Sequence, residues 1–553
     1  MKRRKFLQQG IAGGAAIVAA AVSSHAMVNT LAGAGNAGAV VYPEPPPEPF
    51  ELEEATIEEL QSGMHSGKFT AQSLVEKYLK RIDEVDRRGP AINSVIEVNP
   101  DALAIATELD RERKARGPRS PLHGIPILIK DNIDTADRMM TTAGSLALVG
   151  SRPARDAYVV KRLREAGAVI LGKTNLSEWA NFRSSRSSSG WSGRGGQTRN
   201  PYALDRNPCG SSSGSGAATA ANLCAASIGT ETDGSVVCPS SANSLVGIKP
   251  TLGLVSRSGI IPIAHSQDTA GPMARTVTDA AMLLSVIAGF DPTDPITKPR
   301  PGKSRGGYTG PPDLNALRGA RVGVVRKSFG FNDQVDKIIN EAVDVIKRLG
   351  AIIIDPANIA TAGKFDDSEL EVLLYEFKAD LNKYLAALGA RAPVHSLKEI
   401  IEFNESHRDR EMPYFGQDLF IKAEAKGPLT EKRYLAALAK NHRLSRKEGI
   451  DLVMNQHRLD AMIAPTGGPS WTTDWANGDH FTGGYSSPSA VAGYPHITVP
   501  AGYAFGMPVG ISFFGRANSE RQLLRYAFVF EQATKTRRPP QFLPTAFPAD
   551  TRS

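Results

Sequence analysis

The sequence predicts a layered α/β fold, on the strength of three observations. Amphipathic helical patterns alternate with short apolar runs of strand length through most of the chain. A glycine separates a helix from a strand in the same order twice, at Gly167 and at Gly350. The composition, 41% hydrophobic and 22% charged over 553 residues, is that of a folded globular protein. Large α/β enzymes can build one continuous sheet at this length, so several domains are not required.

The first 26 residues predict a twin-arginine-type signal peptide. A basic start that contains Arg3 and Arg4 precedes a weakly hydrophobic stretch rich in glycine and alanine, and a small-x-small site ends at Ala26. Cleavage could also fall later, at residues 34–39. A membrane anchor is the alternative, but the apolar run is short for the ~20 apolar residues that a span needs. We therefore expect export to the periplasm or beyond, with no membrane attachment after cleavage.

A linker is expected at residues 27–50. Its second part, YPEPPPEPF at residues 42–50, has a proline density that favours stiff, extended chain over packed structure. The folded domain is expected at residues 51–545.

The first half of this domain alternates helices and strands. Helices are expected at residues 71–85, 101–116 and 157–166, and strands at residues 125–129 and 168–171. Asp101 is a residue type that caps helices, and Gly167 ends the third helix. The strand at 125–129 stops at Lys130, and Pro126 is tolerable near a strand's start.

The second half begins with another helix and strand, at residues 335–355. Residues 297–312 are rich in proline, glycine and basic side chains, which predicts a surface loop. Residues 368–456 are mostly helical in pattern, as expected of a helical insertion that could cover a site. Strand-like runs return at residues 461–464, 497–499 and 509–514.

Charge and cysteine usage exclude several classes of function. The formal net charge is +8, and four basic residues near the N-terminus leave 8 − 4, about +4, for the rest. That excess is too small for a nucleic-acid surface. The three cysteines, Cys209, Cys224 and Cys238, are odd in number and contain no Cys-x-x-Cys pair. We therefore expect neither a disulfide framework nor thiolate zinc, and the histidine spacing indicates no metal site.

Two motifs match known patterns in the wrong context. Residues 167–174 match the G-x-x-x-x-G-K-[ST] phosphate loop, but their middle residues are themselves the apolar strand. Residues 210–214 match G-x-S-x-G, which would make Ser212 a nucleophile on an elbow. That motif needs a strand directly before it, and the preceding residues are polar and contain two prolines.

The turn at residues 229–235, GTETDGS, is the strongest candidate for chemistry. It follows an apolar run at residues 223–228 and consists mainly of small residues. Such a turn can present successive backbone N–H groups to one point, which is how an oxyanion hole is built. Ser235, at its end, would then attack a carbonyl held there. A plain turn is the alternative.

Lys130 is the second candidate. A lysine just past a strand usually lies at the surface. A buried lysine has a lowered pKa and can act as a base near neutral pH, because burial disfavours its charged form.

Taken together, these motifs resemble the amidase signature family over residues 51–543. The matching segments are residues 124–131 (GIPILIKD), 209–216 (CGSSSGSG), 229–235 (GTETDGS), 247–251 (GIKPT), 266–275 (SQDTAGPMAR) and 492–502 (AGYPHITVPAG). Within the family the chain looks most like bacterial peptide amidases. The resemblance implies a mixed central sheet flanked by helices on both faces.

The resemblance also implies a catalytic triad of Ser235, Ser211 and Lys130, with a cis peptide bond after Gly210. It implies an oxyanion hole made by the backbone N–H groups of Thr232, Asp233, Gly234 and Ser235. Trp179, Phe182 and Trp191 are candidates for the acyl pocket, although aromatic residues more often pack in a core.

The chain departs from the family pattern at three positions. Cys209 and Ser213 replace glycines of the serine-glycine motif, and Asp233 stands where many members have glycine. None of these changes removes a catalytic group, and we assign Cys209 no catalytic role.

The expected function is that of a serine amidohydrolase that forms an acyl intermediate on Ser235 and needs no metal or cofactor. The substrate would be a small-molecule or peptide amide, and a peptide amidase would release ammonia from C-terminal amides. The alternatives are an aryl-acylamidase, an ammonia-supplying component of a tRNA-dependent amidotransferase, which the export signal argues against, and a catalytically idle amide-binding protein. The sequence does not determine the amide or the oligomeric state.

Overall fold

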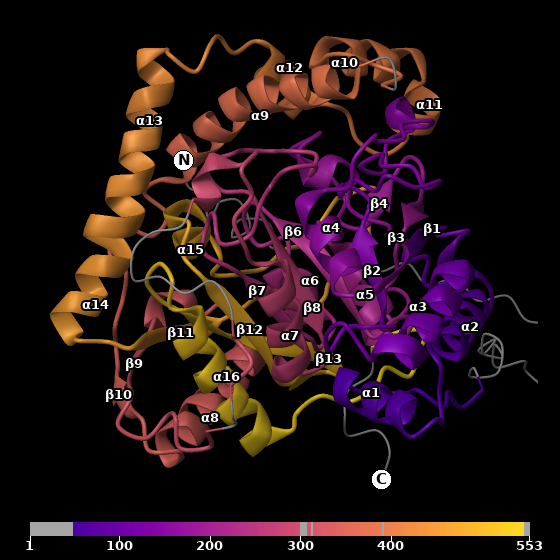
Figure 1. Cartoon of the computed structure of the whole chain (residues 1–553). Helices are drawn as coiled ribbons and strands as arrows, with labels where there is room; N and C mark the ends of the chain where they lie inside the picture. The colour runs from indigo at the N-terminus through magenta and orange to yellow at the C-terminus, as the bar shows by residue number, and fades with distance from the viewer. Residues whose placement is uncertain (1–47, 299–306, 311–312, 390–391, 547–553) are drawn as a thin grey trace, which may run out of the picture. The chain divides into compact units, whose positions relative to one another are not determined.

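The computed structural model describes residues 48–298, 307–310, 313–389 and 392–546, and it confirms the α/β class. Eleven strands form one mixed sheet in the order β1-β3-β2-β6-β8-β7-β12-β13-β11-β9-β10 (Figure 1). The strands are β1 Val95–Val98, β2 Pro126–Lys130, β3 Val169–Thr174, β6 Ala226–Glu231, β7 Val246–Lys249, β8 Thr269–Ala274, β9 Arg321–Val324, β10 Ile352–Ile354, β11 Ala461–Pro465, β12 His496–Ala504 and β13 Met507–Phe514. A separate hairpin pairs β4, Trp191–Ser192, with β5, Gly196–Gln197. The predicted signal peptide and nearly all of the predicted linker lie outside the described residues.

The strands that carry the site lie side by side in the sheet. β2 is parallel to both β3 and β6, with Leu128 opposite Ser227. Every residue of β2 and β6 is buried, which explains why these strands read as continuous small or apolar runs without alternation. Because β2 and β6 are parallel, their carboxyl ends, Lys130 and Glu231, lie at the same edge of the sheet.

Helices cover both faces of the sheet, as the resemblance implied. They are α1 Ile57–His65, α2 Ala71–Arg81, α3 Ala102–Arg116, α4 Tyr158–Glu165, α5 Ser213–Ala220, α6 Val237–Ala242, α7 Val277–Ile287, α8 Asp333–Arg348, α15 Ser487–Ala492 and α16 Glu520–Thr534. On β13, Gly510 faces Ser241 of α6. Successive residues of a strand point to opposite faces. Val509 therefore points to the face opposite to that of Gly510. It pairs with Gly502 of β12, which faces Ile338 of α8, so α6 and α8 cover opposite faces.

The predicted helix, glycine, strand order is confirmed in both places. Gly167 has φ +84° between α4 and β3, and Gly350 has φ +94° between α8 and β10. This left-handed backbone favours glycine just after the end of each helix. β3 extends to Thr174, so the residues that match a phosphate loop form a strand. Asp101 precedes α3 but does not cap it through its side chain; the carboxylate binds Arg138 instead.

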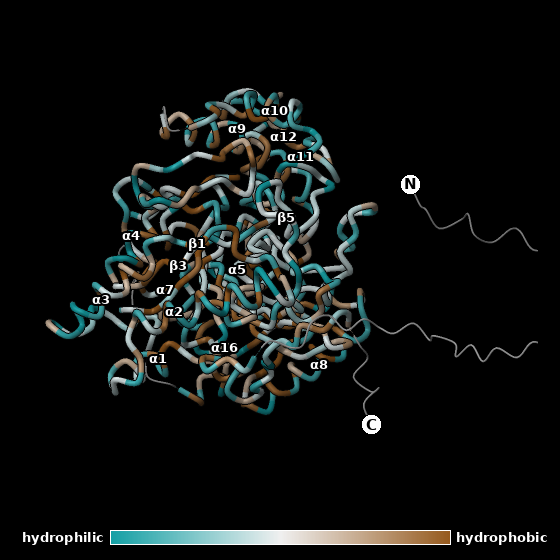
Figure 2. The backbone as a smooth tube through the Cα atoms, turned by 90° about the vertical axis from the view of Figure 1, so that its right-hand side faces the viewer, coloured by the Kyte–Doolittle hydropathy of each residue, from teal (hydrophilic) through white to brown (hydrophobic). Residues whose placement is uncertain are grey.

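Residues 368–456, where the sequence predicts a helical insertion, are mostly helical. This segment includes α9 Asp366–Leu388, α10 Leu397–Ser406, α11 Arg408–Glu411, α12 Asp418–Glu424, α13 Lys432–His442 and α14 Asp451–His457. Helices α9 to α12 lie together above the sheet in Figure 1, and they also lie together at the top of the view in Figure 2. α9 and α12 pack together through Phe377, Leu381 and Phe420, in a cluster that also includes Trp179 and Phe182 from outside the insertion. Among the described residues, no helix is long and apolar enough to cross a membrane.

Candidate active site

Lys130 lies at the end of β2 with its side chain fully buried. Its Nζ donates to Ser211 Oγ at 2.7 Å, to Ser212 Oγ at 3.1 Å and to Thr230 Oγ1 at 3.0 Å. Burial lowers the pKa of Lys130 to about 7, although the charges of Glu231 and Asp268 act in the opposite direction. Near neutral pH a substantial fraction of this lysine is therefore the free amine, which is the form that accepts a proton.

Ser211 follows a cis peptide bond at Gly210–Ser211, as the resemblance implied. Its carbonyl oxygen accepts a hydrogen bond from the backbone N–H of Ser177 at 3.1 Å. A Cβ on Gly210 would lie 2.2 Å from Ser177 Oγ, so only glycine fits there. Ser211 is thus held between β2 and the segment at Ser177, with its hydroxyl beside Lys130.

Ser235 ends the turn between β6 and α6 and is 8% exposed. Its carbonyl oxygen accepts a hydrogen bond from the backbone N–H of Ser212 at 3.1 Å, which joins its segment to that of Ser211. Gly234 has φ +80°, the left-handed backbone that this turn requires. The structure therefore brings the three predicted triad residues into one region.

The turn leaves its own N–H groups available. The Glu231 carboxylate accepts from the N–H groups of Val236 and Val237 at 2.8 and 3.0 Å, which are the first two past the turn. Within the described part of the chain, the backbone N–H groups of Thr232, Asp233, Gly234 and Ser235 donate to no protein acceptor. Four free donors in succession have the chemistry of an oxyanion hole.

Two side chains hold this turn from outside. Thr232 Oγ1 donates to Asp268 Oδ1 at 2.6 Å, and the other oxygen of Asp268 accepts two backbone N–H groups. Asp233, the departure from the family pattern, accepts from Ser487 Oγ at 2.6 Å, at the start of α15. The carboxylate of Asp233 thereby ties the turn to the segment that follows β11.

Sequence reasoning missed the other partners of Lys130. Thr230 Oγ1 accepts from both Lys130 and Asn132 Nδ2, the latter at 2.9 Å. Ser212 Oγ donates to the carbonyl oxygen of Thr230 and accepts from its N–H, at 3.1 and 3.2 Å. Thr230 is the second residue of GTETDGS and Ser212 stands in the serine run, but neither pattern shows that they meet at the lysine.

The expectation of no disulfide is wrong. Cys209 and Cys238 are bonded, with their Cα atoms 6.1 Å apart, and Cys224 is buried and free. The pairing spans 29 residues. An odd cysteine count does not exclude one pair, because pairing depends on which Cα atoms the fold brings within reach.

The three predicted pocket aromatics pack against rings of the helical insertion. The ring centroids of Trp179 and Phe420 are 5.6 Å apart, those of Phe182 and Phe377 5.0 Å, and those of Trp191 and Phe415 5.2 Å. All three predicted residues are buried against the helical insertion. Their contact with a substrate stays a prediction, and the packing matches the commoner role of aromatic residues.

A cavity of about 750 Å³ lies between α9 and the segment at residues 257–269. Its lining includes Asn132, Thr230 and Thr232, so it reaches the residues that support Lys130 and the turn. Tyr384 of α9 also lines it and donates to Asp134 at 2.8 Å.

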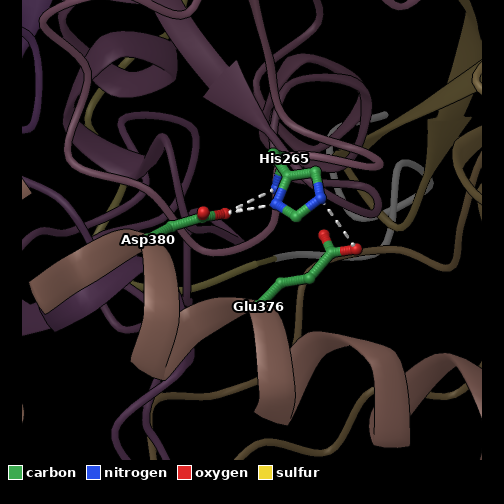
Figure 3. A group of neighbouring side chains, drawn as sticks. All are labelled: His265, Glu376 and Asp380. Carbon is green, nitrogen blue, oxygen red and sulfur yellow. Dashed lines mark hydrogen bonds and ion pairs between the residues drawn. The ribbon is translucent and has the colours of Figure 1, made fainter. Parts of the chain in front are cut away.

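At the side of this cavity, His265 lies between two carboxylates of α9 (Figure 3). Its Nδ1 is 2.8 Å from Asp380 Oδ2, and its Nε2 is 3.4 Å from Glu376 Oε1. Burial lowers the pKa of His265, but the hydrogen bond to Asp380 and the charge of Glu376 outweigh it, and the net shift is upward. A ring nitrogen of His265 and one carboxylate oxygen each of Glu376 and Asp380 are close enough together to hold a metal ion, within 4.8 Å of one another. In this structure, however, both ring nitrogens already face a carboxylate. The group therefore joins α9 to the segment of Asp268 as an ion pair.

Comparisons with known proteins identify the family. The profile described as Amidase matches residues 73–524. A protein of Arabidopsis thaliana named as a probable amidase is 45% identical over 503 residues, covering 89% of this chain and 93% of its own. A putative amidase of Schizosaccharomyces pombe is 38% identical over 537 residues, covering 91% and 89%. The native peptide amidase of Stenotrophomonas maltophilia superposes with a TM-score of 0.85 at 50% identity, covering 89% and 100%. The chain belongs to the amidase family, and is a hydrolase that acts on amide C–N bonds.

Proposed function

We propose that this protein is a peptide amidase, which releases ammonia from C-terminal peptide amides through an acyl intermediate on Ser235. The observation that carries the proposal is the buried Lys130 amine 2.7 Å from Ser211, in a chain 50% identical to a peptide amidase. A lysine with a pKa near 7 replaces the histidine that many serine hydrolases use as a base.

In the first half of the reaction, neutral Lys130 takes the proton of Ser211 while Ser211 takes the proton of Ser235. Ser235 Oγ attacks the carboxamide carbon, and the carbonyl oxygen becomes an oxyanion. The protonated Lys130 then returns its proton through Ser211 to the departing nitrogen, which leaves as ammonia. The acyl group stays on Ser235 as an ester.

The turn at residues 232–235 would stabilise the oxyanion. Its four free N–H groups are fixed by the bonds of Glu231, Thr232 and Asp233 described above, so they need little reorganisation when charge develops. Removing one such donor elsewhere costs about 3 kcal/mol in the barrier. In the second half, water repeats the attack on the ester by the same relay and the carboxylic acid leaves.

The test is release of ammonia and of arylamine from peptide amides, anilides and simple aliphatic amides. We expect ammonia from peptide amides and a loss of about 10⁴-fold or more in Ser235→Ala, as for loss of a nucleophile in other serine hydrolases. The matched control is Ser240→Ala, which removes a buried hydroxyl from α6 next to the turn.

The outcomes separate the alternatives. Release from anilides alone, lost in Ser235→Ala, would make the protein an aryl-acylamidase with the same mechanism. Full activity in Ser235→Ala would exclude the acyl intermediate. No release from any amide would leave the amide-binding protein as the better account.

A further inference from the structure

The disulfide joins the two segments that carry the catalytic serines. Cys209 stands two residues before Ser211, and Cys238 lies in the first turn of α6, three residues after Ser235. Cys224, by contrast, precedes β6 and has no bonded partner. The disulfide therefore connects the segment of Ser211 to the segment of Ser235, the two serines between which the proposed mechanism transfers a proton.

Few other contacts join these segments directly. The backbone N–H of Ser212 donates to the carbonyl oxygen of Ser235 at 3.1 Å, and Asn243 Nδ2 donates to the carbonyl oxygen of Pro208 at 3.0 Å. Lys130 and Ser211, in comparison, are held by the end of the sheet and by the bond at Ser177. Ser235 is joined to the segment of Ser211 by the bond from the Ser212 N–H and by the disulfide.

We propose that the Cys209–Cys238 disulfide is a positioning bond. The bond fixes the distance between Ser211 and Ser235, and full activity requires the two cysteines to be oxidised to the disulfide. Proton transfer between two hydroxyls needs their oxygens within about 2.6–3.2 Å of each other. A displacement of about 1 Å in an active site can cost about 10²-fold in rate. The inference rests on the proposed function for the roles of the two serines.

The bond is open to reduction from one side. Cys238 is partly exposed, whereas Cys209 is buried. A thiolate of a dithiol reductant can therefore attack Cys238 Sγ, and Cys209 leaves as a thiolate that takes up a proton. The second thiol of the reductant then displaces Cys238, which leaves two thiols on the enzyme and an oxidised, cyclic reductant.

Cys224 is the matched internal control. It is fully buried, and burial raises the pKa of its thiol to about 11, so almost none of it is thiolate at neutral pH. A Cys224→Ser variant removes the one free thiol among the described residues and leaves the disulfide intact.

The experiment treats the full-length enzyme with dithiothreitol at 25 °C and counts free thiols before and after. We expect two new thiols and a fall in kcat of about 10-fold or more with a peptide amide, with little change in KM. Labelling of Ser235 by a serine-directed covalent probe should slow by a similar factor. Reoxidation should restore both rates, and Cys224→Ser should behave as the unmodified enzyme at each stage.

A second variant separates positioning from stability. Cys209→Ala/Cys238→Val fills the space of the bond with apolar side chains, and its near-UV circular dichroism should match that of the oxidised enzyme while kcat stays low. Two new thiols with unchanged kcat and labelling rate would overturn the proposal. So would activity that falls only together with the near-UV signal, which would assign the bond to stability alone. If the oxidised enzyme hydrolyses no amide, the proposed function fails, and the labelling rate still tests the bond.

Discussion

In the proposed mechanism Lys130 gives the site its pH dependence, because only its neutral form would accept a proton from Ser211. Burial lowers its pKa to about 7 in the folded protein, so the base becomes protonated as the pH falls through that value. The titration of Lys130 should therefore make kcat/KM rise with pH through about 7 and then level off.

The hydrogen bond from Lys130 to Thr230 provides a sharper prediction. Thr230 Oγ1 accepts from Lys130 Nζ at 3.0 Å, a bond that favours the charged ammonium. In Thr230→Val the ammonium loses this acceptor, so the pKa of Lys130 falls further. The acid limb of the pH profile should move to lower pH by about one to two units, since a hydrogen bond to a charged group contributes about 1.5–3 kcal/mol and one pKa unit corresponds to about 1.4 kcal/mol.

The matched control is Thr174→Val, which removes a buried hydroxyl from the neighbouring strand β3, where it pairs with Ser215. Its acid limb should stay in place. An acid limb that does not move in Thr230→Val, or that moves to higher pH, would show that this hydroxyl does not support the ammonium.

Among single residues, the family resemblance implied Lys130, Ser211 and Ser235 as a triad, which stays a prediction, but it did not indicate their surroundings. Lys130, Ser211 and Ser235 stand in motifs that can be read along the chain. Ser212, Thr230 and Asn132 meet at the lysine only because two parallel strands and a serine loop converge there. The disulfide was missed for the same reason: no local pattern shows that residues 209 and 238 approach each other.

At the scale of elements, a buried ion pair fastens the helical insertion to the rest of the molecule. Arg183 binds Glu178, and its guanidinium carbon lies 4.3 Å from the ring centroid of Phe415. Glu411 of α11 faces Arg183 at 3.7 Å and accepts from Ser145 Oγ at 2.8 Å. Arg183, Glu178 and Glu411 are all fully buried.

Arg183→Met should therefore be strongly destabilising, because it removes the cation beside the buried carboxyl groups of Glu178 and Glu411; burial and the charge of Glu411 already raise the pKa of Glu178 well above its ordinary value. We expect the free energy of unfolding in urea to fall by about 3–5 kcal/mol. The control is Arg408→Met, on the same helix as Glu411, whose partner Glu405 is exposed; its effect should be below about 1 kcal/mol. Equal effects of the two substitutions would show that the buried group contributes no more than a surface pair.

The elements themselves were largely predictable, and their arrangement was not. Periodicity and glycine stops located α4, β3, α8 and β10, because these signals are local. The strand order could not be read in the same way. β8 pairs between β6 and β7, and β12 pairs between β7 and β13, which depends on how distant segments pack.

At the scale of the whole molecule, the insertion and the sheet together form the surroundings of the site. α9 contributes Tyr384 to the cavity beside Thr230 and Asp380 to the ion pair with His265 (Figure 3). The same helix packs on the aromatic cluster of Trp179 and Phe182. Substrate selection is therefore expected from this insertion, whose helical pattern was visible in the sequence.

Export remains a prediction, since residues 1–26 lie outside the described part of the chain. Two features are compatible with it. A twin-arginine-type signal carries folded proteins, and a disulfide persists in the oxidising compartments to which export leads. The proposed dependence of activity on that bond would suit an enzyme that works there.

Whether Ser235 carries the acyl group can be measured from the intact mass of the enzyme mixed rapidly with a peptide ester or amide and quenched in acid. We expect a mass increase equal to the acyl group, located at Ser235 by peptide mapping and absent from Ser235→Ala. In Lys130→Met the adduct should form far more slowly. An acyl adduct on another residue, or an adduct that persists in Ser235→Ala, would contradict the proposed mechanism.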